Sequence, residues 1–148
     1  MNFEPIDSTN LADCVDVFLS AFNAPPWNEN WDKDAATRRL QECHDTPGFS
    51  GLLARIGGQP VAFALGTIEA WDKTNHFYLK EMCVASEQQR SGIGAALVEA
   101  LEHSLKSAGV HKIYLYTARD SNAQNFYQKQ GFYVSSKMIM MTKRLKQE

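Results

Sequence analysis

The chain contains the stretch Val84-Ala85-Ser86-Glu87-Gln88-Gln89-Arg90-Ser91-Gly92-Ile93-Gly94-Ala95-Ala96-Leu97, in which an apolar segment ends, a polar loop follows and a helical pattern begins at once. The first N–H groups of a helix have no partner inside the helix, and the helix dipole favours negative charge beside them. Gly92 and Gly94 let the backbone approach a diphosphate closely, while Gln89 and Arg90 add donors and a positive charge. The stretch therefore predicts an anion-binding turn between a strand and a helix.

Three known phosphate-binding patterns compete for this turn. A Walker loop ends in Gly-Lys-Ser/Thr, which this loop lacks. A dinucleotide fingerprint places a third glycine where this chain has Leu97. Gln89, Gly92 and Gly94 match the remaining pattern, Gln/Arg-x-x-Gly-x-Gly/Ala. With this pattern the sequence resembles the GNAT superfamily of acyl-CoA N-acyltransferases.

The resemblance extends to both sides of the turn. The segment 78–84, Tyr-Leu-Lys-Glu-Met-Cys-Val, looks like the superfamily strand that precedes the loop. The segment 125–132 contains the pattern F-Y-x-K-x-G-F of a later superfamily motif, with Ala123 at the matching small position. The chain departs from the family where members often have an asparagine, because Asp120 stands there and the nearest asparagine is Asn122.

Hydrophobic periodicity and turn residues predict the order of the secondary-structure elements. We expect strands over 3–6, 49–56, 60–69, 76–84, 111–117 and 133–142, and helices over 11–22, 33–43, 92–108 and from about 120 to 131. Gly57-Gly58 predicts a hairpin turn, and the helix between strands 76–84 and 111–117 predicts that these two are parallel. The fold class is thus an α/β sandwich with a mixed, mostly antiparallel sheet, as in a single GNAT-type domain over residues 1–148.

Composition excludes several other classes of function. The chain has 148 residues, with 15 basic and 17 acidic side chains and a net charge of -2, so it lacks the basic excess of a nucleic-acid-binding domain. No apolar run is long enough to span a membrane, and the first residues do not resemble an export signal, which predicts a cytoplasmic protein. Three dispersed cysteines and four scattered histidines predict neither a disulfide framework nor a metal site.

The resemblance implies direct attack of an amine on the thioester of acetyl-CoA. The loop would hold the cofactor's diphosphate through backbone N–H groups, and the open edge of strand 76–84 would pair with the peptide-like pantetheine arm. A strand N–H near Val84 would polarise the thioester carbonyl. The implied cofactor-binding residues are Met82, Cys83, Val84, Gln89, Arg90, Ser91, Gly92, Ile93, Gly94 and, as the nearest asparagine to the family position, Asn122.

The resemblance also implies which residues move protons. An alkyl amine has a pKa near 10, so a base is needed to generate its neutral form at pH 7. Glu81 stands where family members often place that acid, with Glu69 as its main rival. Tyr127 matches the family tyrosine that donates a proton to the departing thiolate. We expect Cys83 to be a buried structural cysteine rather than a nucleophile, since no base for it is evident.

The acceptor pocket of the family is built from the first two helices and the loop between them. In this chain that loop carries Trp27, Glu29 and Trp31, which, with Asp32, could cage a cationic amine or could simply pack as a lid. The compact, nearly neutral chain favours a small-molecule amine. A protein N-terminal or lysine acetyltransferase and a CoA-binding sensor without catalysis are the alternatives, and the resemblance allows a homodimer.

Overall fold

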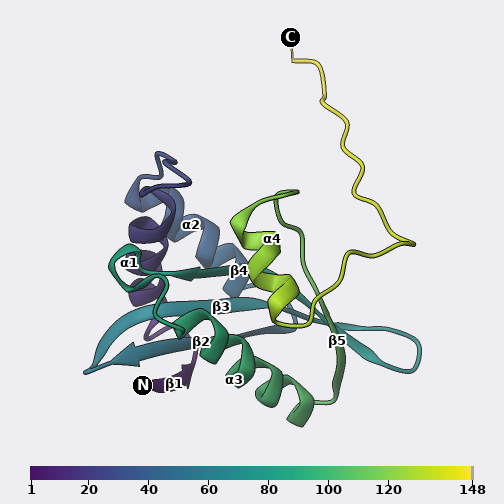
Figure 1. Ribbon diagram of the computed structural model, residues 1–148, viewed down its shortest axis with the longest axis horizontal. Helices are drawn as coiled ribbons and strands as arrows, with labels where there is room; N and C mark the ends of the chain where they lie inside the picture. Colours follow the sequence, from purple (N-terminus) through teal and green to yellow (C-terminus); the bar gives the residue numbers. More distant parts are fainter. Residues whose placement is uncertain (148) are drawn as a thin grey trace. The chain divides into compact units, whose positions relative to one another are not determined.

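The protein forms two compact units, Met1–Tyr116 and a unit that begins at Thr117, in a computed structural model that describes residues 1–147 (Figure 1). The first unit contains a five-stranded sheet in the order β1-β2-β3-β4-β5. The strands are β1 (Asn2–Pro5), β2 (Phe49–Ile56), β3 (Gln59–Ala70), β4 (Asn75–Val84) and β5 (Val110–Tyr114). The helices are α1 (Leu11–Phe22), α2 (Lys33–His44) and α3 (Ile93–Ser107).

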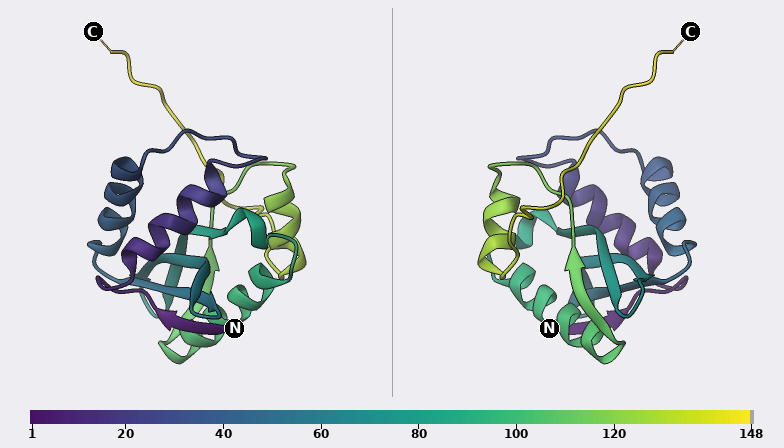
Figure 2. Two further views of the ribbon diagram at one scale, coloured as in Figure 1. Left: turned by 90° about the vertical axis from the view of Figure 1, so that its left-hand side faces the viewer. Right: turned by 90° about the vertical axis from the view of Figure 1, so that its right-hand side faces the viewer.

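The sheet is mixed, as the sequence predicts. The first four strands pair antiparallel in chain order, and β5 pairs parallel with β4 after the crossover through α3. Helices α1 and α2 cover one face of the sheet and α3 covers the other (Figure 2). An apolar core cluster lies between α1, α2 and the sheet, and includes Phe18, Leu40, Phe63 and Cys83. Every element predicted within this unit is present, although β5 ends at Tyr114 rather than at residue 117.

Turn residues fix the connections that position the site. Gly57 and Gly58 have φ values of +56° and +81°, as the predicted two-residue hairpin between β2 and β3 requires. Gly109, with φ +82°, follows the end of α3 and lets the chain turn back into β5. Both turns agree with the sequence prediction.

One irregularity in β4 decides which side chains share a face of the sheet. Leu65 lies opposite Glu81 while the next residue, Gly66, lies opposite Leu79, so Lys80 is an extra residue in β4, a β-bulge. A Cβ atom on Gly66 would come 1.9 Å from the Tyr78 carbonyl oxygen, so only glycine fits there. The bulge shifts the alternation by one residue, and Tyr78 and Glu81 consequently point to the same face, the one that α2 covers.

The second unit contains α4 (Asn122–Lys129), which begins at the predicted cap. The Ser121 side chain accepts a hydrogen bond from the Gln124 N–H. The predicted strand over 133–142 is wrong: residues 132–147 have no regular secondary structure. The Ser135 hydroxyl accepts hydrogen bonds from the N–H groups of Lys137 and Met138, and this local turn interrupts the extended backbone that the apolar pattern favours.

No helix within residues 1–147 has the length and apolarity needed to cross a bilayer.

Candidate active site

The open edge of β4 is the first element of the site. Pairing with β5 ends at Tyr78, opposite Tyr114, and beyond this point β4 pairs with β3 alone among the described residues. The Ala85 N–H donates to the Val61 carbonyl, and main-chain groups of an antiparallel strand alternate in direction. Cys83 therefore bonds toward β3, while the main-chain groups of Met82 and Val84 point to the open edge. An extended, amide-bearing molecule could pair there as an added strand.

The predicted anion-binding turn follows directly. After the 3-10 turn Ser86–Gln88, Arg90 and Gly92 adopt left-handed conformations with φ +65° and +82°, and α3 begins at Ile93. No side chain caps this helix, and nothing lies within 4 Å of the position that a Gly92 Cβ would occupy. Gln89 does not point outward as a donor to an anion, because its Nε2 donates to the Val84 carbonyl over 3.1 Å. It ties the loop to the strand instead.

Glu81 lies beside the open edge, and its side chain is 14% exposed. Both contacts with Arg39 of α2, at 3.0 Å from Nε and 2.9 Å from NH2, use the same carboxylate oxygen, Oε1, so Oε2 is left for another partner. Burial raises the pKa of Glu81, while the hydrogen bond and the charge of Arg39 oppose this rise. A partly buried carboxylate that is held through one oxygen and has a raised pKa is suited to accept a proton.

Glu69, the rival base, lies elsewhere on the same face. It accepts a hydrogen bond of 2.6 Å from the Tyr114 hydroxyl, and it lies four residues along β3 from Leu65, which is opposite Glu81. Residues of a strand rise by about 3.3 Å each, so the two glutamates stand roughly 13 Å apart along the strand. The backbones of the two glutamates are thus well separated, and Glu81 is the one beside the open edge.

The loop between α1 and α2 is ordered by its own hydrogen bonds. The Asn23 side chain accepts from the Trp31 N–H and donates to the Trp31 carbonyl, both over 2.9 Å. The Trp31 ring packs edge-on against Phe18 at 4.9 Å, and its Nε1 donates to Glu29 Oε1 over 2.7 Å. Trp31 is thus a packing residue that fixes Glu29, whereas Trp27 is 40% exposed.

Two other candidate residues have structural roles. Asp32 caps α2 by accepting from the Ala35 N–H, so its carboxylate is engaged. Cys83 is buried, and burial raises the pKa of its thiol well above the ordinary value, which disfavours the nucleophilic thiolate. Within the described residues, no group of three or more His, Cys, Asp or Glu side chains is placed to hold a metal ion.

The residues predicted from the later motif lie in the second unit. Tyr127 is half-buried on α4, with its ring 5.2 Å from that of Phe126 and 5.4 Å from that of Phe132. The Phe132 N–H donates to the Tyr127 carbonyl, which closes the end of the helix. Asn122 is the exposed first residue of α4.

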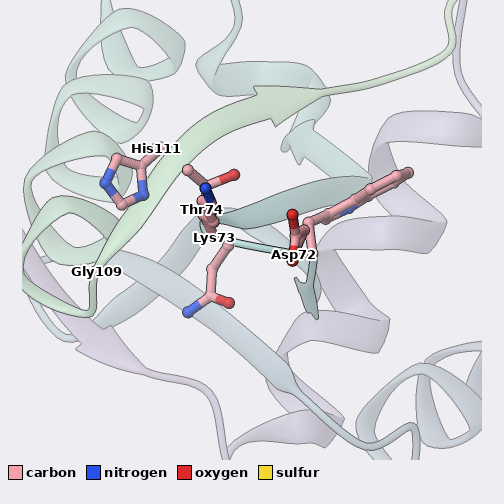
Figure 3. Close-up of a pocket in the computed structure, with 7 residues that line it drawn as sticks. Asp72, Lys73, Thr74, Gly109 and His111 are labelled. Atoms are coloured by element: carbon pink, nitrogen blue, oxygen red, sulfur yellow. The ribbon is translucent and has the colours of Figure 1, made fainter.

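Within the first unit, a shallow hollow of about 240 Å³ lies between the β3–β4 hairpin tip and the turn from α3 to β5 (Figure 3). Asp72, Lys73 and Thr74 line it from the hairpin, and Gly109 and His111 from the turn. It contains neither the open edge of β4 nor the start of α3, so its position does not suit the predicted chemistry.

Comparison with known families decides the assignment. The model of the acetyltransferase (GNAT) family matches residues 16–132, which is most of the chain. The chain belongs to the GNAT acetyltransferase family. The family resemblance that the loop motif predicts is thereby confirmed.

One curated protein is similar to this chain over part of its length. The Mycobacterium tuberculosis (strain ATCC 25618 / H37Rv) protein "Probable N-acetyltransferase Rv2775" is 29% identical over 90 residues, 61% of this chain. The match spans about half the length of that curated relative.

Solved structures share the fold. A Clostridium difficile 630 protein described as a possible acetyltransferase has a TM-score of 0.80 at 15% identity, covering 98% of both chains. The aminoglycoside N-acetyltransferase AAC(6')-Iy in complex with CoA has a TM-score of 0.73 at 17% identity, covering 97% of this chain and 95% of that one. An aminoglycoside acetyltransferase from an uncultured soil metagenomic sample, in complex with sisomicin, has a TM-score of 0.74 at 16% identity and covers 98% and 96%.

Sequence reasoning missed Arg39 and the Tyr114–Glu69 pair. Arg39 lies mid-helix in α2, where an arginine is ordinarily a solvated surface residue, and its partner is 42 positions away. Tyr114 meets Glu69 across 45 positions. The sequence alone offers one signal for such contacts, which is a charged or aromatic residue at a helix or strand position that the apolar pattern places partly inside.

Proposed function

We propose that this GNAT protein transfers the acetyl group of acetyl-CoA to the primary amine of a small molecule, within a single domain over residues 1–148. The observation that supports this most strongly is the open edge of β4 running directly into the uncapped start of α3. These two features present main-chain donors in line, first for an amide-bearing arm and then for a diphosphate. Structural neighbours that bind CoA and sisomicin favour a small-molecule acceptor.

Acetyl-CoA fits the residues that are present. The space around Gly92 is open, and the first N–H groups of the 15-residue helix α3, which have no partner within the helix, begin there. The exposed Arg90 adds a positive charge. We assign Ser91, Ile93 and the other loop residues to the diphosphate through their backbone, and the edge groups of Met82 and Val84 to the pantetheine arm. Cys83 supports them by holding the strand to β3. When bound, acetyl-CoA supplies an activated thioester.

Glu81 is proposed as the general base. Its Oε2 atom would accept the proton of the incoming amine, directly or through one water, while Arg39 keeps the carboxylate in place through Oε1. Glu29, whose charge raises the pKa of Glu81, favours a cationic acceptor near the same place. Tyr127 is proposed as the donor of a proton to the departing sulfur, on the basis of its motif. Asn122 is proposed as a cofactor contact on the same basis.

Assembly as a homodimer is a further proposal, which sedimentation of the pure protein tests. Within the described tail, the apolar side chains of Met138, Ile139, Met140 and Met141 are 66–84% exposed, and such a run disfavours a free monomer.

Thermal unfolding with acetyl-CoA, CoA, NAD and ATP in parallel tests the cofactor. A ligand at a hundred times its dissociation constant stabilises by about 2.7 kcal/mol, which raises the midpoint by several degrees in a chain of this size. We expect a shift with acetyl-CoA and CoA alone, followed by amine-dependent release of free thiol. A shift with both CoA species but no thiol release from any amine would favour a CoA-binding sensor instead.

A further inference from the structure

Three tyrosines gather on the α2 face of the sheet, at the place where the pairing of β4 with β5 ends. Tyr78 and Tyr114 stack with ring centroids 5.0 Å apart and an interplanar angle of 6°. Tyr116 stands edge-on to both, at 5.7 Å and 6.3 Å, and is 60% exposed. We call Tyr78, Tyr114, Tyr116 and the adjoining Glu69 the tyrosine platform. Its rings form an aromatic surface that solvent reaches, not an interior cluster.

The platform contains one carboxylate, that of Glu69. Glu69 is half-buried, and within residues 1–147 its hydrogen-bond partner is the neutral Tyr114 hydroxyl. Among the described residues, Glu69 takes part in no ion pair. Arg39 is near enough to influence Tyr78, but it is paired with Glu81. His76 lies opposite Glu69 on β4, and its ring packs at a tilt against Trp71. A carboxylate beside exposed aromatic rings attracts a cation through charge and through the ring faces.

The β-bulge at Lys80 aligns this platform with the proposed base. Without the extra residue, Tyr78 and Glu81 would point to opposite faces of the sheet. With it, the platform and Glu81 share one face, and Glu69 and Glu81 stand roughly 13 Å apart along the strand. The two carboxylates differ, because Glu81 is paired with Arg39, whereas Glu69 forms no ion pair within residues 1–147.

We propose that the tyrosine platform is a second acceptor subsite, which binds a remote ammonium group of a polycationic acceptor whose reacting amine lies at Glu81. The proposal rests on the proposed function, and it narrows the acceptor to polyamines, including those built on sugar rings. The acceptor's body crosses the face of Tyr78 between the two carboxylates. The amine that reacts must lose its proton, so it lies at the base, whereas the remote ammonium keeps its charge and pairs with Glu69.

Calorimetric titration of the CoA-bound protein tests this subsite, because CoA without an acetyl group permits binding and no turnover. The probes are spermidine, neamine and the monoamine hexylamine. We expect spermidine and neamine to bind about fivefold more tightly than hexylamine, the gain of one partly exposed ion pair. Glu69→Gln should remove that gain and leave hexylamine unaffected, and Tyr116→Ala should weaken the two polyamines by about threefold. Glu99→Gln, an exposed acid of α3, is the matched control and should change none of the three.

Each alternative result overturns a distinct statement. Equal affinity for hexylamine and the polyamines, an equal loss for all three probes in Glu69→Gln, or the same loss in Glu99→Gln would overturn the subsite. CoA binding without binding of any probe would overturn the subsite and leave the cofactor assignment standing. Failure of CoA itself to bind would overturn the proposed function, and the subsite with it.

Discussion

The two halves of β4 have different neighbours, and we propose that they bind different substrates. Asn75–Tyr78 lies between β3 and β5 and presents an aromatic side chain on the α2 face. Within residues 1–147, Lys80–Val84 pairs with β3 alone, and its main-chain groups at Met82 and Val84 point to the open edge. One strand can therefore bind the acceptor through side chains and the cofactor through its backbone, with Glu81 where the two halves meet.

Removal of the base should have the largest effect. Glu81→Gln keeps the size and the hydrogen-bonding ability of the side chain but abolishes proton acceptance, so kcat should fall by about 10²–10³. CoA affinity should stay unchanged, because the backbone of the open edge is intact. Steady-state kinetics and calorimetry measure the two quantities, and Glu99→Gln is the control. A kcat within twofold of the wild type would remove Glu81 from proton transfer.

The close packing at Gly66, beside the β-bulge that separates the two halves of β4, should be the next most sensitive to substitution. Gly66→Ala would place a methyl group 1.9 Å from the Tyr78 carbonyl oxygen and 2.8 Å from the Phe77 ring. We expect a loss of about 3 kcal/mol in the free energy of unfolding, measured by urea denaturation. Gly58→Ala, in an open turn with φ +81°, provides the comparison and should cost about 1 kcal/mol. Equal losses would contradict the close packing at Gly66.

The glycines that flank the two ends of α3 provide a matched pair for testing where the diphosphate binds. Gly92 and Gly109 both have φ +82° and open space around the missing Cβ atom, and they flank the two ends of the helix. An alanine at either position should cost about 1 kcal/mol of stability through the same backbone strain. Only Gly92→Ala should also weaken CoA binding, by about tenfold, because it alone alters the diphosphate site. Equal CoA affinities in the two variants would place the diphosphate elsewhere.

The smallest expected effect is a shift in pH dependence. Arg39 lowers the pKa of Glu81 against the opposing effect of burial, so Arg39→Gln should raise that pKa further. The base must be ionised to act, and the acid limb of kcat/KM should therefore move to higher pH. At pH values well above the acid limbs of both the wild type and the variant, kcat/KM should be nearly unchanged. A limb that moves to lower pH would show that another group titrates.

Local signals predicted most of this fold and the turn that precedes α3. The glycines at 57–58, 92 and 109, and the cap at Ser121, are turn and cap residues whose conformations follow from their own chemistry. The strand over 133–142 was predicted wrongly, because an apolar pattern gives propensity without supplying a partner strand, and the Ser135 turn competes with it.

The side-chain arrangement around Glu81 could not be predicted in the same way. Strict alternation along 76–84 places Tyr78 and Glu81 on opposite faces, and only the bulge opposite Leu65 and Gly66 brings them together. The contacts of Glu81 with Arg39 and of Glu69 with Tyr114 join residues more than 40 positions apart. Such contacts depend on packing between elements, which periodicity does not describe.

Amide hydrogen exchange along β4, followed residue by residue by NMR with and without CoA, tests the central claim most directly. In the free protein the Cys83 amide should exchange slowly, because it bonds to β3, while the amides of Met82 and Val84 should exchange fast. CoA should slow Met82 and Val84 strongly and leave Asn75–Tyr78 unchanged. Unaltered exchange at Met82 and Val84 in the presence of saturating CoA would contradict the assignment of the cofactor to this edge.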